Sequence, residues 1–114
     1  SEPFARFAYP GAQADDPSTF TTTDGHRTRT IAGFSTPDAF AKVYAYYRQR
    51  LPSNSQTMRV ISANGSVATF YIESRGAPEA MAVQISSDKP NVTRILLTRY
   101  ALRGLKSRDR ELMQ

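Results

Sequence analysis

Residues 36–52, TPDAFAKVYAYYRQRLP, decide the fold, because they carry a clear helical period. Thr36 can cap a helix, Pro37 suits its first position, and Pro52 ends it. Between these residues, apolar side chains recur at the three- and four-residue spacing of one buried helical stripe. The stripe consists of Phe40, Val43, Tyr44, Tyr47 and Leu51. The sequence therefore predicts a helix that packs one face against another element.

Strands with alternating apolar residues flank this helix. Residues 26–34 form one strand before it, and four strands follow it, with turns at Asn64-Gly65, 76–78 and 88–91. Alternating apolar residues mark the first three of these strands: Met58 and Val60 in the first, Ala68, Phe70 and Ile72 in the second, and Met81, Val83 and Ile85 in the third. The fourth strand is formed by residues 92–101. We predict an α+β fold, one helix packed on a four- to five-stranded antiparallel sheet, in the order strand, helix, then four strands. Residues 18–23 could add a short strand, paired through Asp24-Gly25 to residues 26–34.

The turn at Asn64-Gly65 sets which side chains share a face. A three-residue loop, 63–65, with a left-handed Gly65 would pair Val60 with Ala68 and Met58 with Phe70. This register gathers the apolar residues on the helix side and leaves the other side open to water. We expect the open side to carry Thr57, Arg59, Thr69, Tyr71, Glu73, Ala82 and Gln84. Four of these are the candidate partner-binding residues: Arg59, Tyr71, Glu73 and Gln84.

The chain divides into an N-terminal segment (1–25), a single α+β domain (26–101) and a charged tail (102–114). Phe4, Phe7 and Tyr9 are expected to pin the N-terminal segment to the body. The last strand has apolar residues on both faces, with Val92, Leu96 and Tyr100 on one side and Ile95 and Leu97 on the other. This pattern predicts that the strand is covered twice. The second cover could be the N-terminal segment, the tail or a second subunit.

Composition limits the chemistry that is available. The 114 residues fit one domain, and 39% of them are hydrophobic, which is enough for a core. The chain has no Cys, which excludes disulfides, thiolate catalysis and Cys-based metal sites. The net charge of +5 favours either an anionic partner or a solvated basic surface. No run approaches the ~18 consecutive apolar residues of a membrane-spanning helix.

Catalytic motifs are not evident in the sequence. His26 is the only histidine, and no Gly-x-Ser-x-Gly turn accompanies it. Most carboxylates fall in predicted turns or in the tail, and Asp15-Asp16 lacks the further ligands of a calcium loop. We therefore predict no catalytic residues, no metal site and no cofactor, and we expect that the protein is not an enzyme.

Nucleic-acid binding is the alternative function that the charge suggests. Arg59 and Tyr71, with Arg29 and Arg94, partly fit a surface on which basic and aromatic residues interleave. Arg103, Lys106, Arg108 and Arg110 of the tail could add phosphate contacts. The competing interpretation is cross-strand packing of Arg over Tyr on a solvated sheet.

Two resemblances bear on function. The order of a strand, a helix and a meander resembles the cystatin-like architecture, but the Gln-x-Val-x-Gly loop and the Trp of that family's inhibitors are missing. Small exported bacterial domains of unknown function are more similar. The matching pieces are Tyr9-Pro10-Gly11-Ala12, the strand from Thr28 to Phe34, Tyr46-Tyr47 with Leu51, and 64–68. This resemblance implies a periplasmic or secreted setting and no particular activity.

These observations lead to one functional prediction. We expect a non-enzymatic extracytoplasmic binding or structural module whose partner is a protein or a small ligand. A basic nucleic-acid-binding module is the alternative, and an oligomer is possible with either. Ser1 is expected to be a trimmed N-terminus, before which a signal peptide or lipid anchor could have stood.

Overall fold

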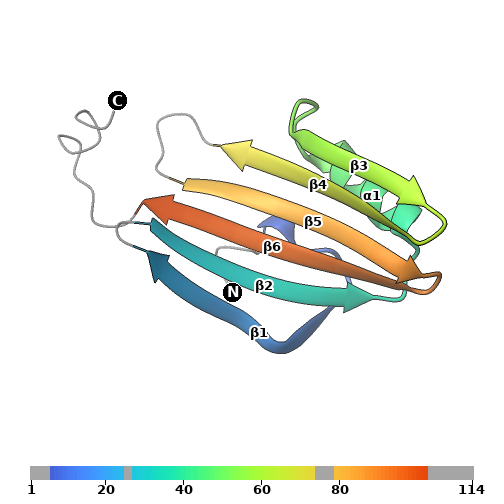
Figure 1. Cartoon of the computed structure of the whole chain (residues 1–114), viewed down its shortest axis with the longest axis horizontal. Helices are drawn as coiled ribbons and strands as arrows, with labels where there is room; N and C mark the ends of the chain where they lie inside the picture. Colours follow the sequence, from blue (N-terminus) through green and yellow to red (C-terminus); the bar gives the residue numbers. More distant parts are fainter. Residues whose placement is uncertain (1–5, 25–26, 74–78, 103–114) are drawn as a thin grey trace.

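The computed structural model describes residues 6–24, 27–73 and 79–102, and these form one antiparallel sheet with a helix on one side (Figure 1). The elements are β1 (Gln13–Asp24), β2 (Arg27–Thr36), α1 (Phe40–Arg50), β3 (Gln56–Ser62), β4 (Gly65–Glu73), β5 (Glu79–Lys89) and β6 (Val92–Leu102). The spatial order of the strands is β1-β2-β6-β5-β4-β3. The predicted α+β class, a single helix on an antiparallel sheet, is confirmed for the described residues. The predicted strand number and order are wrong, because the sheet has six strands and two of them precede the helix.

Strand β1 accounts for the additional strand. It pairs with β2 over most of its length, from Gln13 opposite Ser35 to Asp24 opposite Arg27. The register shifts between Ala14 and Thr19, around Pro17. Proline cannot donate to a ladder, so its position fits an edge strand with a bulge. The short strand expected at residues 18–23 is therefore part of a longer strand, which begins at Gln13 and lies within the predicted N-terminal segment.

Helix α1 carries the predicted buried stripe. Val43 and Tyr47 are almost wholly buried, and Phe40 and Tyr44 are half-buried beside them. The helix ends at Arg50, and the N–H of Leu51 still donates to the carbonyl oxygen of Tyr47 at 2.9 Å. Its start differs from the prediction. Ala39 occupies the N-cap position without a side-chain hydrogen bond, and the hydroxyl of Thr36 accepts from the N–H of Asp38 instead.

The core lies between α1 and one face of the sheet. The buried strand residues include Ala32, Ala68, Phe70, Val83, Ile85, Ile95 and Leu97. They form cross-strand rows, one of which runs from Phe70 through Val83 and Leu97 to Ala32. The alternation predicted for β4 and β5 is therefore confirmed. No helix among the described residues has the length and apolar character needed to span a membrane.

The β3–β4 hairpin corrects the predicted register. Its loop is a two-residue turn, Ala63-Asn64, which pairs Val60 with Val67 and Met58 with Thr69. Gly65 has a φ of +147° and begins β4; a Cβ there would lie 3.2 Å from the carbonyl oxygen of Ser87. Because directly paired residues share a face, Met58 and Val60 point away from the helix. All seven residues of β3 are exposed, so burial in the core does not fix the side to which they point.

Candidate binding face

The face of the sheet opposite α1, here called the open face, is the surface turned toward the viewer in Figure 1. Cross-strand pairing assigns its residues. One row runs Met58, Thr69, Gln84, Leu96 and Gly33; a second runs Val60, Val67, Ser86, Arg94 and Ser35; a third runs Tyr71, Ala82, Thr98 and Ile31. Val92 joins this face by alternation with Arg94 along β6. The described residues place no helix over this side.

The open face gathers exposed apolar side chains. The described residues include six large hydrophobic side chains that are exposed, and five of them lie on this face: Met58, Val60, Tyr71, Val92 and Leu96. The contrast along β6 is sharp, because Leu96 is 37% exposed while its neighbour Leu97, on the helix side, is 0% exposed. The five are distributed over β3, β4 and β6, and the polar residues Thr69 and Gln84 lie between Met58 and Leu96 in the ladder.

A polar cluster borders the apolar residues. The Asp15 carboxylate reaches over from β1, accepts a hydrogen bond from the Ser35 hydroxyl at 3.0 Å and pairs with Arg94 at 2.7 Å. Gly33 leaves room for it, since a Cβ at that position would lie 2.8 Å from the Asp15 Oδ2 atom. The exposed guanidinium of Arg94 is therefore paired with a carboxylate.

A shallow depression lies at the turn end of β4, β5 and β6. Val60, Val67 and Val92 line it, together with Arg94 and the hydroxyl-bearing residues Ser62, Ser66, Ser86 and Ser87. The Ser87 hydroxyl donates to the carbonyl oxygens of Lys89 and Val92, at 2.7 and 2.6 Å, which secures the β5–β6 turn. The depression therefore has apolar walls and polar edges.

Three of the four predicted site residues meet on the open face. Tyr71 is opposite Ala82, Gln84 is opposite Thr69, and the Tyr71 hydroxyl lies 3.4 Å from the Glu73 carboxylate. The ring of Tyr71 also contacts that of Tyr100, with centroids 6.4 Å apart. Arg59 is the exception, and its predicted face is wrong. It pairs with Ala68 on the helix side, where its guanidinium lies 5.1 Å from the centroid of the Tyr44 ring.

The face also includes residues that sequence reasoning did not select. Met58 and Val60 were expected in the core, and the shifted register moves both of them to the open face. Val92 and Leu96 left a signal in the sequence, since the last strand is apolar on both of its faces. The structure buries Ile95 and Leu97 on the helix side, whereas on the other side Val92 and Leu96 are exposed and Thr98 is buried. The pattern predicted a second cover on this side, and the described part of the N-terminal segment, one of the covers considered, lies against α1 instead.

The basic residues are spread over the molecule, and three of the described ones, Lys42, Arg94 and Arg99, form ion pairs with carboxylates. Arg99 forms an ion pair with Glu79 at 3.0 Å, and Arg50 lies over the Tyr46 ring at 3.8 Å. The expected combination of Arg59 with Tyr71 on one surface does not form, because the two residues lie on opposite faces. Arg29 is on the open face with Arg94. Arg103, Lys106, Arg108 and Arg110 lie outside the described residues.

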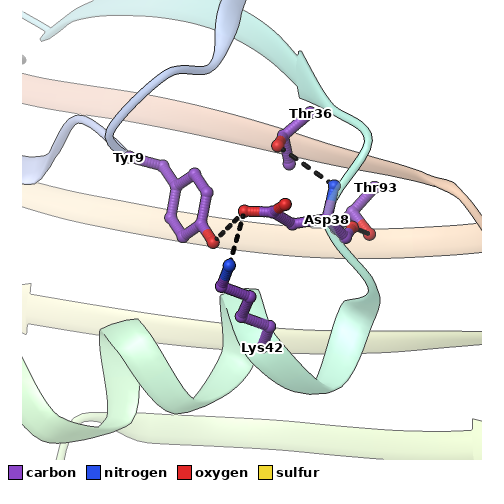
Figure 2. A network of polar contacts seen from close by, with 5 residues as sticks. All are labelled: Tyr9, Thr36, Asp38, Lys42 and Thr93. Atoms are coloured by element: carbon purple, nitrogen blue, oxygen red, sulfur yellow. Dashed lines mark hydrogen bonds and ion pairs between the residues drawn. The ribbon is translucent and has the colours of Figure 1, made fainter.

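On the helix side, tyrosines join the N-terminal segment to α1. The Tyr9 hydroxyl donates to Asp38 Oδ2 at 2.6 Å, and Lys42 lies 3.6 Å from the same oxygen (Figure 2). Thr93 donates to the carbonyl oxygen of Asp38 at 2.7 Å, and the Tyr47 hydroxyl donates to that of Phe7 at 2.6 Å. The pinning role predicted for Phe7 and Tyr9 is thus confirmed; Phe4 lies outside the described residues.

The phenols of this cluster stay protonated at neutral pH. Burial of the ring, followed by the hydrogen bond to Asp38, raises the pKa of Tyr9 to about 12. Burial also raises the pKa of Tyr47, still further. Both hydroxyls therefore act as hydrogen-bond donors, and their partners are groups of the fold itself. The geometry is that of a structural tether.

The remaining candidate chemistry concerns metal ligands and the single histidine. They contain no group of three or more His, Asp or Glu side chains placed to hold a metal ion. His26, the residue considered for a catalytic triad, lies outside them. Comparison with known proteins adds no family: no family model matches the chain, and neither does any curated protein or solved structure.

Proposed function

We propose that this protein is a non-enzymatic binding module that holds a protein partner against the open face of its sheet. The observation that carries the proposal is the group of five exposed apolar side chains on that face. Transfer of such side chains from water to an interface contributes roughly 25 cal/mol for each Å² of apolar surface that is buried. A partner that covers them gains this free energy, while the isolated domain leaves the same area in contact with water.

The composition of the face favours a protein over a nucleic acid. Tyr71 and Leu96 supply the large apolar anchors that dominate protein interfaces, and Gln84 lies close to both in the ladder. The charged groups at the border are mixed in sign, with Glu73 near one end and the Arg94–Asp15 pair near the other. A phosphate backbone is held by uncompensated cations, and this mixture presents few of them.

Site-specific photo-crosslinking in the producing cell tests the proposal. A photoreactive residue is placed at Gln84, in the middle of the face, or at Gln49, an exposed position of α1 that serves as the matched control. We expect a discrete protein adduct from position 84 and none from position 49. Adding Leu96→Lys should abolish the adduct, because the lysine puts a solvated charge into the apolar contact. Equal adducts from both positions, or an adduct to nucleic acid, would refute the proposal.

We propose further that the module works outside the cytoplasm. This proposal rests on the similarity of the Tyr9–Ala12 motif and the strand–helix–meander order to small exported domains. Cell fractionation, with the chain detected in each fraction, is the measurement. Recovery in the periplasm or medium is expected. Recovery in the cytoplasm alone would contradict the proposed setting. It would not bear on binding at the open face, which the crosslinking experiment tests.

A further inference from the structure

The two edges of the sheet differ in how well they are protected against pairing with another strand. Edge strand β1 contains Pro17 and three aspartates, and its register shifts between Ala14 and Thr19. Charges, proline and bulges are the features that block strand addition. Strand β3, at the opposite edge (Figure 1), contains one charged residue, Arg59, and no proline. Only the β3 edge is therefore left open to a further strand.

Strand β3 is also unusually apolar for an exposed edge. Of the six exposed large hydrophobic side chains, three lie on this seven-residue strand: Met58 at 43%, Val60 at 48% and Ile61 at 64% exposure. Met58 and Val60 point to the open face, and Ile61 points to the helix side. A strand added beside β3 would therefore find apolar contacts on both faces of the sheet.

The hairpin determines which backbone groups of β3 face outward. In a two-residue turn, the flanking residues, here Ser62 and Gly65, exchange backbone hydrogen bonds. Hydrogen-bonding direction alternates along a strand, so Val60 also bonds toward β4. Arg59 and Ile61 then direct their N–H and C=O groups to the outer edge. The described residues place no strand there to receive them.

We infer that the β3 strands of two copies of this protein pair antiparallel about a two-fold axis at Val60. This register lets Arg59 exchange backbone hydrogen bonds with the second copy's residue 61, and it places Val60 opposite its own counterpart. Two neighbouring registers keep the same faces together. Charge disfavours the one in which Arg59 would oppose its own counterpart and the two cations would repel, and cysteine crosslinking separates the Val60-centred register from the one centred on Ile61. The pairing joins the two sheets and makes their open faces continuous.

The inference does not depend on the proposed partner, because β3 pairing uses the backbone groups at the edge of the sheet; the two share only the side chains of Met58 and Val60, and the crosslinking position Gln84 and the Leu96→Lys variant lie away from β3. Its first test is the mass in solution by analytical ultracentrifugation. We expect twice the chain mass of 12.7 kDa. Val60→Lys should halve that mass, and Val60→Glu should do the same, because each puts like charges opposite one another on the axis. An equal mixture of the two variants should restore the dimer. Unfolding midpoints near that of the parent chain would verify that both variants fold.

Cysteine crosslinking tests the register, since the chain has no cysteine of its own. Val60→Cys places two sulfur-bearing residues in a non-hydrogen-bonded pair, with Cα atoms about 4.5 Å apart, which permits a disulfide. Ile61→Cys, the control, is more exposed, but the two copies would lie about 7–8 Å apart on the diagonal. We expect rapid oxidation to a covalent dimer for Val60→Cys only. A monomeric parent chain, or equal oxidation of both variants, would overturn the inference.

Discussion

Tyr9→Phe tests whether one hydroxyl secures the N-terminal segment to the helix. The substitution keeps the ring, which packs on Tyr46 and Tyr47 with centroids 5.0 and 6.4 Å away, and removes only the donor to Asp38. A hydrogen bond to a charged acceptor contributes about 1.5–3 kcal/mol to the free energy of unfolding. The Asp38 side chain is 33% exposed, so water can replace part of the lost bond. We therefore expect a loss near the lower limit, about 1.5 kcal/mol.

Urea unfolding at neutral pH measures this loss. The matched control is Tyr46→Phe, whose hydroxyl makes an exposed hydrogen bond of 3.2 Å to the carbonyl oxygen of Ala8 and should contribute well under 1 kcal/mol. In thermal unfolding, a loss of about 1.5 kcal/mol lowers the Tm of a domain of this size by roughly 6 °C or more. If Tyr9→Phe were no more destabilising than Tyr46→Phe, the tether would be incorrectly assigned.

The pH dependence of the same variant has a definite sign. The pKa of Tyr9 is raised from 10.0 to about 12, chiefly by burial and then by Asp38, so the folded state retains this proton more tightly than the unfolded state. A group whose pKa is raised on folding stabilises the folded state. This stabilisation is complete at a pH below the pKa of the unfolded state and is lost as the pH rises through the pKa of the folded state. The stability difference between parent and Tyr9→Phe should therefore shrink above pH 10. A difference that grew with pH would contradict this reasoning.

Three further substitutions test the two sides of the sheet and the hairpin. Leu97→Ala should lower the free energy of unfolding by about 2–5 kcal/mol, while Leu96→Ala, one residue away, should cost under about 1 kcal/mol, because only Leu97 is enclosed in the core. Similar unfolding midpoints for the two would show that the open face is covered in solution. Gly65→Ala should cost about 1–3 kcal/mol in denaturant unfolding, because φ is +147° and the Ser87 carbonyl is 3.2 Å from the added Cβ. A neutral effect would indicate that the turn relaxes.

The sequence predicted the elements whose burial is strongest. The helical stripe ending in Tyr47 and Leu51 and the alternation of β4 and β5 were correct, because packing against one core admits only one orientation for them. In β3 both faces of the strand are exposed, so hydrophobicity could not decide its register. A two-residue turn decided it instead and reversed the faces of Val60 and Arg59. Strand β1 contains Pro17 and adjacent aspartates, which do not suit a central strand, yet an edge strand tolerates them.

The exposed face follows from the size of the elements. An eleven-residue helix is about 16 Å long and about 10 Å wide, and it can cover only part of one side of a sheet. Six strands span about 24 Å across the hydrogen-bonding direction. The opposite side of the sheet is left without a helical layer. Threonine would suit such solvent-facing strand positions equally well. Val60 and Leu96 add little to the folding of the isolated chain, and the proposed function assigns their apolar area to contact with another polypeptide.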